Sequence, residues 1–458
     1  MNTYLLIFKA QKNKNINLSN QVYIHILNGI LKNKIKLGEK LPPSRQLASI
    51  FCVSRNTILN AIDILNSENL LKTYIGSGTY ITDTLPDIYK QNFSFKNITN
   101  TEILMRTRQH NGLLATGITD KSLFPSQKFI RAMKNGITDS ININNKTGHI
   151  KFKQSIVNYI NTIRGIECTT NNIVPITSAQ AGFNLIFNTI LDKNSNILLE
   201  DPCYQDIRTL IKLNNHNEKF ISNIYNFKNI NAVYLTPSNQ YDTDDIMRMS
   251  QRLEIINKTL KYKSWILEDD IGCEICFEKV FPPSFYSISE NVIYIGSFSK
   301  VISPSIKIAY IIAPEKITKK LNSYNGIMGT EPSAFIQSTI SQMIDDKSLY
   351  VHIRHMKKIY KERIIQIKKS ISKHMPFASF NKDKNNGLEI SVNLPSYMND
   401  KKITQEIYKT GFSCKRLSKN SIHKNINGLS IGFGNTNVKE IDNLIEKVSK
   451  VCLKYNIH

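Results

Sequence analysis

The segment GSFSK, residues 296 to 300, places a lysine directly after a short apolar run, NVIYI. Two small polar residues, Ser297 and Ser299, lead into Lys300, and a second mostly apolar stretch follows it. A lysine withdrawn from water has a lowered pKa and can attack a carbonyl carbon as a nucleophile. The alternative is a solvated lysine at a strand end, in a chain with many lysines. The residues that share the neighbourhood of Lys300 decide between the two.

Four other short apolar runs end in the same way before helix-like segments: NIVPITS, NILLEDP, NAVYLTP and SWILEDD. Buried strands that alternate with helices predict an α/β fold, in which helices cover a mostly parallel sheet. Ligands of such sheets bind beyond the carboxyl ends of the strands, so the polar residues there become neighbours. They are Ser178, Ala179 and Gln180; Asp201, Pro202 and Tyr204; Ser238, Asn239 and Gln240; Glu268, Asp269 and Asp270; and Ser297, Ser299 and Lys300.

One lysine, one carboxylate, one aromatic ring and one anion site are what pyridoxal 5'-phosphate requires. The lysine forms a Schiff base with the cofactor, and the carboxylate keeps the pyridine nitrogen protonated so that the ring acts as an electron sink. Residues 178–180, at the start of a helix, form a site for an anion such as phosphate. The strand ends therefore predict a pyridoxal phosphate site.

Residues 17–82 carry a different pattern. The first helix has an approximate apolar stripe, and Ser44 and Ser54 are each placed to cap a further helix, with Arg45 and Arg55 in the first turns. Two short alternating runs around GSG then predict a hairpin. The stripe of the first helix consists of Val22, Ile24, Ile26, Leu27, Ile30 and Leu31, and that of the third of Ile58, Ala61, Ile62 and Leu65.

Three helices followed by a hairpin predict a winged helix-turn-helix, whose third helix enters the major groove of DNA by its N-terminal end. Arg55 and Asn56 in that first turn are suited to reading guanine and adenine edges. Ser and Thr side chains there suit phosphate contacts. The alternative is a small helical domain with a solvated polar face.

The run LPPSRQLASIFCVSRNTILNAIDILNSENLLKTYIGSGTYI resembles the GntR-type winged helix, which carries LPxSRxLA, vSRxTv and a GxGTfV wing. The resemblance covers about 65 residues and implies binding of double-stranded DNA. Arg45, Arg55 and Thr57 are the contacts that it implies most directly. The full set of expected DNA contacts is Ser44, Arg45, Ser54, Arg55, Asn56, Thr57, Gly76 and Gly78.

The rest of the chain resembles the fold type I aminotransferases, and with the winged helix in front it is similar to the MocR subfamily of regulators. The matching segments are SLFPSQKF, IRGIEC, ITSAQAGF, LLEDPCYQ, TPSNQYDTDDIMRMSQRLEII, ILEDDIGCEI, GSFSKVISPSIKIAYIIAP and HIRHMKKIYKERI. The resemblance implies that Lys300 forms the aldimine, Asp269 pairs with the pyridine nitrogen and Tyr204 stacks on the ring. Further implied cofactor contacts are Ser178, Ala179, Gln180, Asn239, Ser297, Ser299 and Lys307.

Several positions depart from the family pattern. Lys307 stands where the family has a phosphate-binding arginine. The lysine keeps the positive charge but cannot donate the two parallel hydrogen bonds of a guanidinium. Ile271 stands in place of a tyrosine and cannot donate a hydrogen bond, and Ser430 stands in place of the arginine that grips an amino acid's carboxylate. Asn239 replaces His, and Asp242 and Asp244 replace the Pro and Gly of a turn. Lys415 and Arg416 could supply the missing charge, or could be a solvated basic pair.

The resemblance implies four parts: a winged helix domain over residues 1–83, a linker over 84–112, a large domain with the cofactor site over 113–375, and a small C-terminal α+β subdomain over 376–458. The net charge of +24 favours polyanions, although it is spread along the chain. Seven scattered cysteines fit a reducing cytoplasm, and no apolar run approaches the roughly 20 residues of a membrane span. Cys273 and Cys276, in a strand-like run, have no second pair, so we expect no metal site.

These observations favour a cytoplasmic DNA-binding regulator that senses an amine, an amino acid or the cofactor itself. The family's head-to-tail, domain-swapped homodimer is the expected assembly, and the linker permits it. The first alternative is a working aminotransferase with an attached DNA-binding domain, which the changes at Ile271 and Ser430 disfavour because substrate orientation is lost. The second is a DNA-binding protein whose large domain is a cofactor-free dimerisation scaffold.

Overall fold

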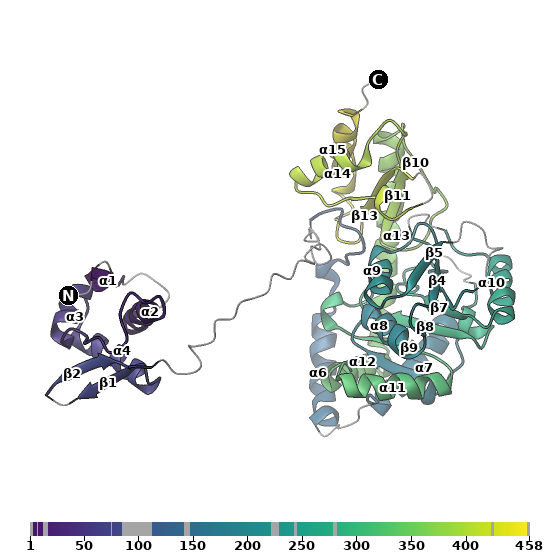
Figure 1. Ribbon diagram of the computed structural model, residues 1–458. Coiled ribbons are helices and arrows are strands. Elements are labelled where there is room, and N and C mark those ends of the chain that lie inside the picture. The colour runs from purple at the N-terminus through teal and green to yellow at the C-terminus, as the bar shows by residue number, and fades with distance from the viewer. Residues whose placement is uncertain are drawn as a thin grey trace. The chain divides into compact units, whose positions relative to one another are not determined.

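The computed structural model describes residues 3–6, 8–11, 17–74, 76–84, 112–141, 147–220, 229–241, 245–277, 282–422 and 426–455. The chain divides into two compact units, residues 1–106 and 107–458 (Figure 1). Nearly all of the expected linker, together with Asp242 and Asp244, lies outside the described residues.

The first unit contains the predicted three helices and hairpin. The third helix begins where the sequence indicates, because the Ser54 hydroxyl accepts a hydrogen bond from the Thr57 N–H at 3.2 Å. Its buried side chains are those of the predicted stripe, Ile58, Ala61, Ile62 and Leu65. In chain order, the elements are α1 (Thr3–Leu6), α2 (Leu18–Leu31), α3 (Ser44–Phe51), α4 (Arg55–Ser67), β1 (Leu71–Tyr74) and β2 (Gly78–Ile81).

Two local expectations in this unit are wrong. Ile24 and Leu31 are exposed, because the 3.6-residue period of α2 turns Val22, Ile26 and Ile30 toward the core instead. Ser44 is the first residue of α3 rather than its cap, and Pro43 precedes it without a side-chain hydrogen bond. The Ser44 hydroxyl is therefore available to a neighbouring helix.

The second unit is built on a seven-stranded sheet in the order β3-β9-β8-β7-β6-β4-β5. The strands are parallel except β9, which runs antiparallel to both of its neighbours. The predicted mostly parallel sheet is thus confirmed. The strands are β3 (Ile173–Ile176), β4 (Asn196–Leu199), β5 (Asn217–Phe220), β6 (Ala232–Leu235), β7 (Trp265–Asp269), β8 (Val292–Ser297) and β9 (Ala309–Ile312).

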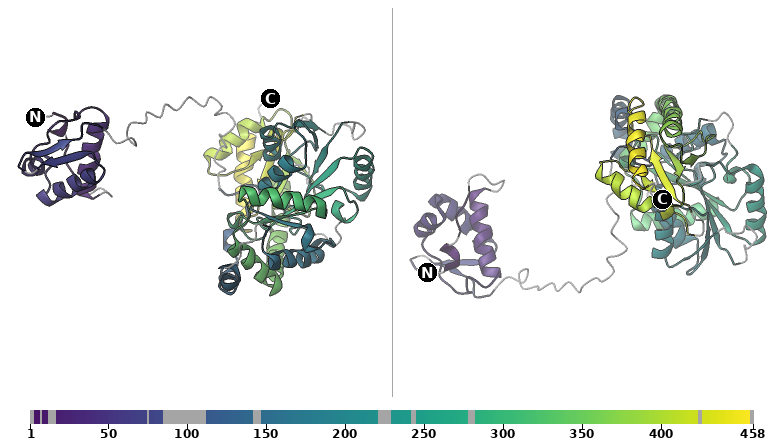
Figure 2. Two further views of the ribbon diagram at one scale, coloured as in Figure 1. Left: turned by 60° about the horizontal axis from the view of Figure 1, so that its bottom comes forward. Right: turned by 90° about the horizontal axis from the view of Figure 1, so that it is seen from above.

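Helices cover both faces of this sheet, as Figures 1 and 2 show. Alternate strand residues enter different cores: Ile293 and Ile295 of β8 pack with α8, while Tyr294 packs with α7 and α12. Burial on both faces explains why inner strands such as β6 and β8 are nearly continuous apolar runs, whereas the edge strand β5 is polar. The helices are α6 (Ser126–Ile141), α7 (Ile150–Arg164), α8 (Ala179–Thr189), α9 (Gln205–Leu213), α10 (Met249–Lys261), α11 (Glu315–Met328), α12 (Ala334–Asp345) and α13 (Ser348–His374).

A smaller antiparallel sheet lies at the end of α13, in the order β10-β11-β13-β12. Ile390 and Val392 of β11, with Leu429 and Ile431 of β13, face a core shared with α13, α14 and α15. The elements are β10 (Ser379–Phe380), β11 (Glu389–Asn393), α14 (Asp400–Lys409), β12 (Lys415–Arg416), β13 (Gly428–Gly432) and α15 (Ile441–Leu453).

The expected strand around Cys273 and Cys276 does not form, because residues 271–274 are a turn shortly after β7 and Cys276 makes only an isolated bridge to Asn386. Within the described ranges, no cluster of three or more His, Cys, Asp or Glu side chains could hold a metal ion. In the same ranges, no helix is both long and apolar enough to span a bilayer.

Candidate functional site

Lys300 and Asp269 lie at the same edge of the large sheet. Asp269 ends β7 and pairs with Ile295 of the neighbouring parallel strand β8, and Lys300 lies in the turn that follows β8. The Lys300 Nζ donates a hydrogen bond to the Gly117 carbonyl at 2.6 Å. Burial lowers the pKa of this ammonium, although the negative charges of Glu389 and Asp269 oppose the shift. Lys300 is thus a half-buried lysine with a lowered pKa, and in this it differs from a fully solvated lysine.

Two glycines let the backbone approach Lys300 closely. A Cβ on Gly117 would lie 2.5 Å from the Lys300 Nζ, which is closer than real contacts allow, and Gly117 has a φ of +68°. Gly272, with a φ of +85°, lies where a Cβ would be 3.5 Å from the Lys300 Cγ. The lysine stem is therefore packed between two turns that only glycine adopts easily.

Asp269 is held by donors from two elements. The Tyr234 hydroxyl of β6 donates to Oδ2 at 2.7 Å, and the Ile271 N–H donates to Oδ1 at 3.2 Å. Burial raises the pKa of this carboxyl to about 6, against these two hydrogen bonds. A cation placed beside Asp269 would restore its charge, and a pyridinium nitrogen is such a cation.

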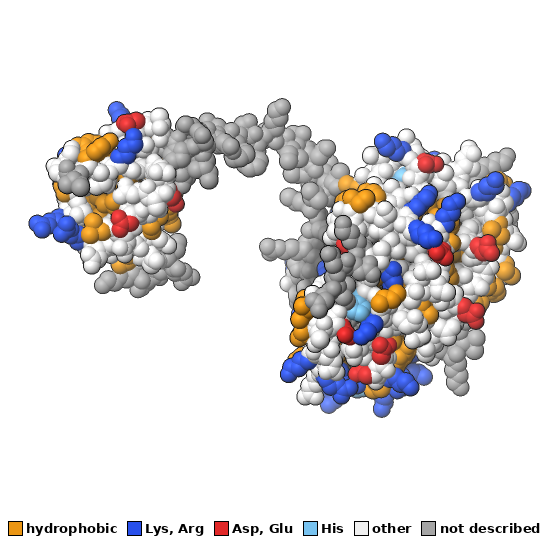
Figure 3. Space-filling view, turned by 90° about the horizontal axis from the view of Figure 1, so that it is seen from below, with side chains coloured by type: hydrophobic (Ala, Val, Ile, Leu, Met, Phe, Trp, Pro, Cys, Tyr) orange, Lys and Arg blue, Asp and Glu red, His pale blue; other side chains and the backbone are white. Residues whose placement is uncertain are grey.

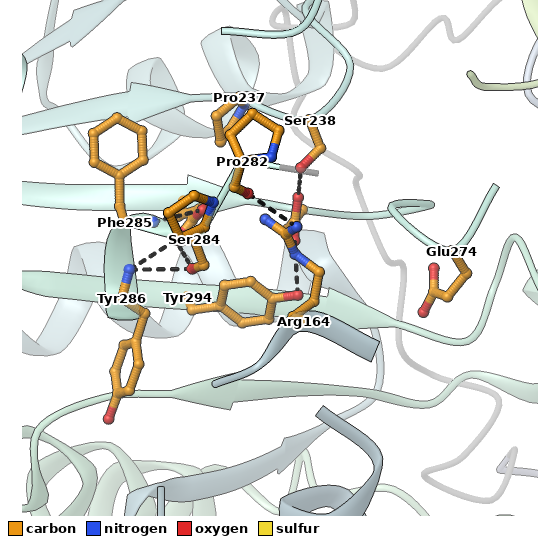
Figure 4. Close-up of polar contacts among 12 residues, drawn as sticks. Arg164, Pro237, Ser238, Glu274, Pro282, Ser284, Phe285, Tyr286 and Tyr294 are labelled. Atoms are coloured by element: carbon orange, nitrogen blue, oxygen red, sulfur yellow. Dashed lines mark hydrogen bonds and ion pairs between the residues drawn. The ribbon is translucent and has the colours of Figure 1, made fainter. Parts of the chain in front are cut away.

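Beneath the site, a buried ion pair ties several elements together. Arg164, the last residue of α7, donates through Nε to Asp270 at 2.7 Å, and the Tyr294 hydroxyl donates to the same carboxylate at 3.0 Å. Ser238 is a third donor to Asp270. Figure 4 shows Arg164, Ser238 and Tyr294 converging from three segments. The pair fixes the carboxyl end of β7 and so positions Asp269.

Asp269 is followed by one buried carboxylate and preceded by another. Glu268 accepts hydrogen bonds from the Ser284 hydroxyl at 2.6 Å, the Phe285 N–H at 3.1 Å and the Tyr286 N–H at 3.2 Å (Figure 4). Burial raises the pKa of Glu268 to about 7. Glu268 and Asp270 are both buried and accept several internal hydrogen bonds, whereas Asp269 between them is only half-buried.

The expected phosphate site is at the start of α8. Ser178 caps the helix by accepting from the Ala181 N–H at 3.1 Å, and the first N–H groups of a helix have no partner within it. The Gln180 Nε2 donates to the Tyr204 hydroxyl at 3.3 Å, which brings the helix start and the predicted stacking ring together. That hydroxyl in turn donates to Asp206 at 2.7 Å.

Ser297, Ser299 and Lys307 lie at the neighbouring strand ends. The Ser297 hydroxyl contacts that of Ser299 at 3.1 Å. Ser297 pairs with Ala309, so Lys307, two residues before Ala309, lies at the same end of the sheet as Ser299. Lys307 is exposed and has a left-handed backbone with a φ of 50°. Among the described residues, no side-chain hydrogen bond or ion pair links Lys307 to Ser297 or Ser299.

Asn239 leaves a buried acceptor open. Its Oδ1 is buried and has no hydrogen-bond partner among the described residues. A Cβ on Gly387 would lie only 3.2 Å from its Nδ2, so this loop also approaches the small subdomain closely. An unsatisfied buried polar atom is costly, and a bound ligand with a donor would satisfy it. Together with Lys300 and Asp269, this open acceptor fits a polar cofactor.

The structure separates the two candidates for replacing the missing arginine. Lys415 pairs with Ser430 across β12 and β13, whereas Arg416 pairs with Leu429, whose side chain is in the core. Sequence reasoning also missed Glu389, which begins β11 and whose charge acts on Lys300. Its only signal was an acidic residue in an apolar strand, with Ser391 two residues later on the same face.

The first unit presents a polar surface at the start of α4. Arg45, Arg55 and Asn56 are exposed. The Arg55 Nε donates to the Ser44 hydroxyl of α3 at 3.3 Å, and the Ser54 and Thr57 hydroxyls contact each other at 2.8 Å. The hydrogen bond from Arg55 to Ser44 holds the guanidinium between the two helices of the helix-turn-helix.

The hairpin turns at two glycines, and Lys40, from the segment before α3, packs beside it. Gly76 and Gly78 have φ angles of +79° and +115°, as the turn requires. The Lys40 Nζ lies 5.5 Å from the centre of the Tyr80 ring, within the range of a cation–π contact. These features suit a wing that contacts DNA.

Residues 18–81 match the family of bacterial regulatory proteins called the gntR family. The chain is 24% identical to the "Probable rhizopine catabolism regulatory protein MocR" of Rhizobium meliloti, over 77% of this chain and 76% of that protein. It is also 24% identical to the "Uncharacterized HTH-type transcriptional regulator YdeL" of Bacillus subtilis, over 94% of this chain and 96% of that one.

The fold of the second unit is similar to solved aminotransferases. An archaeal alanine:glyoxylate aminotransferase has a TM-score of 0.70 at 18% identity, over 75% of this chain and 91% of its own. The α-aminoadipate aminotransferase LysN of Thermus thermophilus, complexed with N-(5'-phosphopyridoxyl)-L-leucine, has a TM-score of 0.68 at 17% identity, over 76% and 94%. The chain therefore joins a segment that matches the gntR family to a domain with an aminotransferase-like fold, and over most of its length it is similar to the two regulators named above.

Proposed function

We propose that this regulator binds operator DNA through its winged helix and carries pyridoxal phosphate on Lys300. An amine, an amino acid or the cofactor itself then changes DNA binding, because it is bound better by one arrangement of the protein than by another. The observation that carries the proposal is the juxtaposition of the half-buried Lys300, whose pKa is lowered, with the half-buried carboxylate of Asp269. The exposed Arg55 and Asn56 of the same chain support the DNA-binding half.

The residues present fit pyridoxal phosphate. Asp269 would pair with the pyridine nitrogen, Tyr204 would cover the ring, and residues 178–180 with Ser297 and Ser299 would hold the phosphate. Bound cofactor supplies an electrophilic aldehyde and an electron sink. The protein's part is to keep Lys300 neutral enough to react and Asp269 ionised beside the ring nitrogen. Ile271 packs against apolar neighbours and offers the ring no hydrogen bond.

The titration of Asp269 predicts how cofactor binding depends on pH. Because its pKa is raised to about 6, the carboxylate becomes neutral as the pH falls through 6 and no longer stabilises a cationic ring. Affinity for pyridoxal phosphate should then fall about tenfold for each pH unit below 6. Equilibrium dialysis of the cofactor measures this slope. In Asp269→Asn the affinity for pyridoxal phosphate should be low at every pH. If the affinity of this variant still fell tenfold per pH unit below 6, the titration would belong to another group.

For the DNA interface, Arg55→Ala is expected to weaken the specific complex by about 1–3 kcal/mol and to relax base preference at one position. Binding to a randomised operator library measures both effects. Ser44→Ala is the matched control, because it keeps the guanidinium of Arg55 and removes only the hydroxyl to which that group donates at 3.3 Å. The control should lose less affinity and keep the base preference. Unchanged selectivity in Arg55→Ala would remove this residue as a reader.

A second copy of this chain is the proposed partner, and α6 supplies an apolar surface for it. Ile130, Met133, Ile137 and Ile141 are exposed at spacings that place them on one side of the helix. The opposite side packs on α12, where a Cβ on Gly136 would lie 2.5 Å from the Ser338 hydroxyl. An exposed apolar stripe of this kind marks an interaction surface. The domain-swapped form remains a prediction from the resemblance.

Footprinting of the DNA beside the gene for this chain tests the whole proposal. A dimer with two winged helices should protect two half-sites about one helical turn apart, or a multiple of this spacing. Addition of pyridoxal phosphate and candidate amines should change the protection or its affinity. One half-site would contradict the dimer, and protection that is insensitive to the cofactor and to every amine would contradict sensing. Steady turnover of an amino acid with a keto acid would favour the alternative, a working aminotransferase with an attached DNA-binding domain.

The basic character of the chain is a separate contribution to DNA binding. On the face drawn in Figure 3, Lys and Arg side chains are spread over both units, with exposed hydrophobic side chains between them. Distributed positive charge adds sequence-independent attraction that weakens with salt. Specific binding should therefore be measured at a stated ionic strength, against excess non-specific DNA.

A further inference from the structure

The smaller sheet presents a polar row on the face opposite its core. Lys415 on β12 pairs with Ser430 on β13, and Ser430 pairs with Ser391 on β11. Directly paired residues share one face of a sheet, and so do residues two apart on a strand. Glu389 therefore lies on the same face as Ser391. The intervening residues, such as Ile390 and Leu429, fill the core on the other side.

This polar row faces the neighbourhood of Lys300. The position where a Cβ on Gly117 would lie is 2.5 Å from the Lys300 Nζ and 3.9 Å from the Glu389 Oε2, so lysine and carboxylate reach the same point. The charge of Lys415 acts on Lys300 as well, and contributes to its lowered pKa. The row thus places a negative charge next to Lys300 and a positive charge farther along the same surface.

Neither charge has a close ion-pair partner among the described residues, although Glu389 lies near enough to Lys300 for its charge to act there. Both side chains are half-buried, and in the described parts of the chain neither Glu389 nor Lys415 has an ion-pair partner within 4.0 Å or a side-chain hydrogen bond. Buried charges are ordinarily paired, because desolvation without a partner is costly. Two unpaired opposite charges on one surface match a ligand that carries both signs.

We propose that the effector is a free amino acid, an inference that rests on the proposed function. The carboxylate of the amino acid binds Lys415, and its amino group is attracted to Glu389 beside Lys300. Lys415 then takes the role that Ser430 cannot perform, from the adjacent strand. The register excludes Arg416 from this role, because its partner Leu429 points into the core.

Equilibrium calorimetry with the twenty protein amino acids tests the proposal on full-length protein, with and without pyridoxal phosphate. The tightest amino acid is then compared with the amine that lacks its carboxylate. Wild type should prefer the amino acid. Lys415→Gln should weaken amino-acid binding by about 10- to 100-fold, the loss expected for a hydrogen bond between charged groups, and should remove the preference. Lys415→Arg should retain it.

Two matched variants separate a direct role from a structural one. Arg416→Gln, one residue away on the other face, should bind the amino acid like wild type. Glu389→Gln should weaken the binding of the amino acid and of the amine by the same factor. The preference for the amino acid over the amine should therefore remain. A preference that survives in Lys415→Gln, or a wild type that binds no amino acid, would overturn the proposal.

Cofactor uptake is read separately, from the visible absorbance of the loaded protein. Failure of uptake would contradict the proposed function. Binding to the cofactor-free protein that depends on Lys415 would still support this inference.

Discussion

Lys300→Ala is expected to abolish covalent uptake of pyridoxal phosphate, so that the purified variant stays colourless while wild type is yellow. The expected loss is complete, because a Schiff base with the protein needs this amine and no other lysine is placed beside Asp269 in the described site. Absorbance after incubation with excess cofactor and removal of the unbound fraction measures the effect. Borohydride reduction followed by peptide mapping identifies the modified residue.

A matched control is Lys319→Ala. Lys319 is an exposed lysine on α11 whose ammonium is 2.9 Å from a Glu315 carboxylate oxygen. This variant should take up pyridoxal phosphate like wild type. That result would show that the loss of uptake in Lys300→Ala is specific to Lys300 and does not follow from the removal of an arbitrary lysine. A colourless wild type after the same incubation would instead favour the cofactor-free scaffold, in which Lys300 is only a half-buried side chain hydrogen-bonded to the Gly117 carbonyl.

Arg164→Ala is expected to destabilise the second unit by about 3–5 kcal/mol, because it leaves the Asp270 carboxylate buried without its cation. The two charged side chains are 3% and 0% exposed, so water cannot replace the lost partner. The single tryptophan, Trp265, begins the same strand that ends next to Asp270. Its fluorescence during urea unfolding therefore reports the stability of this unit and not that of the winged helix.

Arg131→Ala is the control for this prediction. Arg131 also pairs with an aspartate, Asp346, at 3.0 Å, but its side chain is 68% exposed. Exposed pairs contribute about 0–1 kcal/mol, so the urea midpoint should shift little. Equal shifts in the two variants would mean that the Asp270 cluster is accessible to water. If Arg164→Ala proves too unstable to purify, Tyr294→Phe removes one donor at 3.0 Å and should give a smaller loss in the same direction.

Much of the fold followed from the sequence, because the signals are local. The stripe at Ile58, Ala61, Ile62 and Leu65 has helical period, and Ser54 is a capping residue whose hydroxyl meets an N–H three residues later. Neither depends on distant parts of the chain. Continuous apolar runs ending in polar residues likewise predicted parallel strands, and parallel strands bring their carboxyl ends to one edge. This is why Asp269 and Lys300 could be placed together without coordinates.

Other features were decided by residues far apart in the chain. Ser44 looked like a helix cap, but its hydroxyl accepts from Arg55 of the next helix. Cys273 lies in a turn and Cys276 makes only an isolated bridge to Asn386, because the chain turns at residues 271–274 after β7 has ended at Asp269. Such choices depend on tertiary partners, which outweigh local preference.

The polar row of the smaller sheet shows most clearly which features the sequence could predict and which it could not. Lys415 and Arg416 are adjacent cations, equivalent by composition and charge, and only the pairing of β12 with β13 turns one toward Ser430 and the other toward the core. Glu389 had no recognisable role until folding brought it close to Lys300, 89 positions earlier in the chain. Local periodicity and helix capping depend on neighbouring residues and can therefore be predicted from the sequence. Strand register and the proximity of distant charges come from packing the whole chain, so only the tertiary structure decided them.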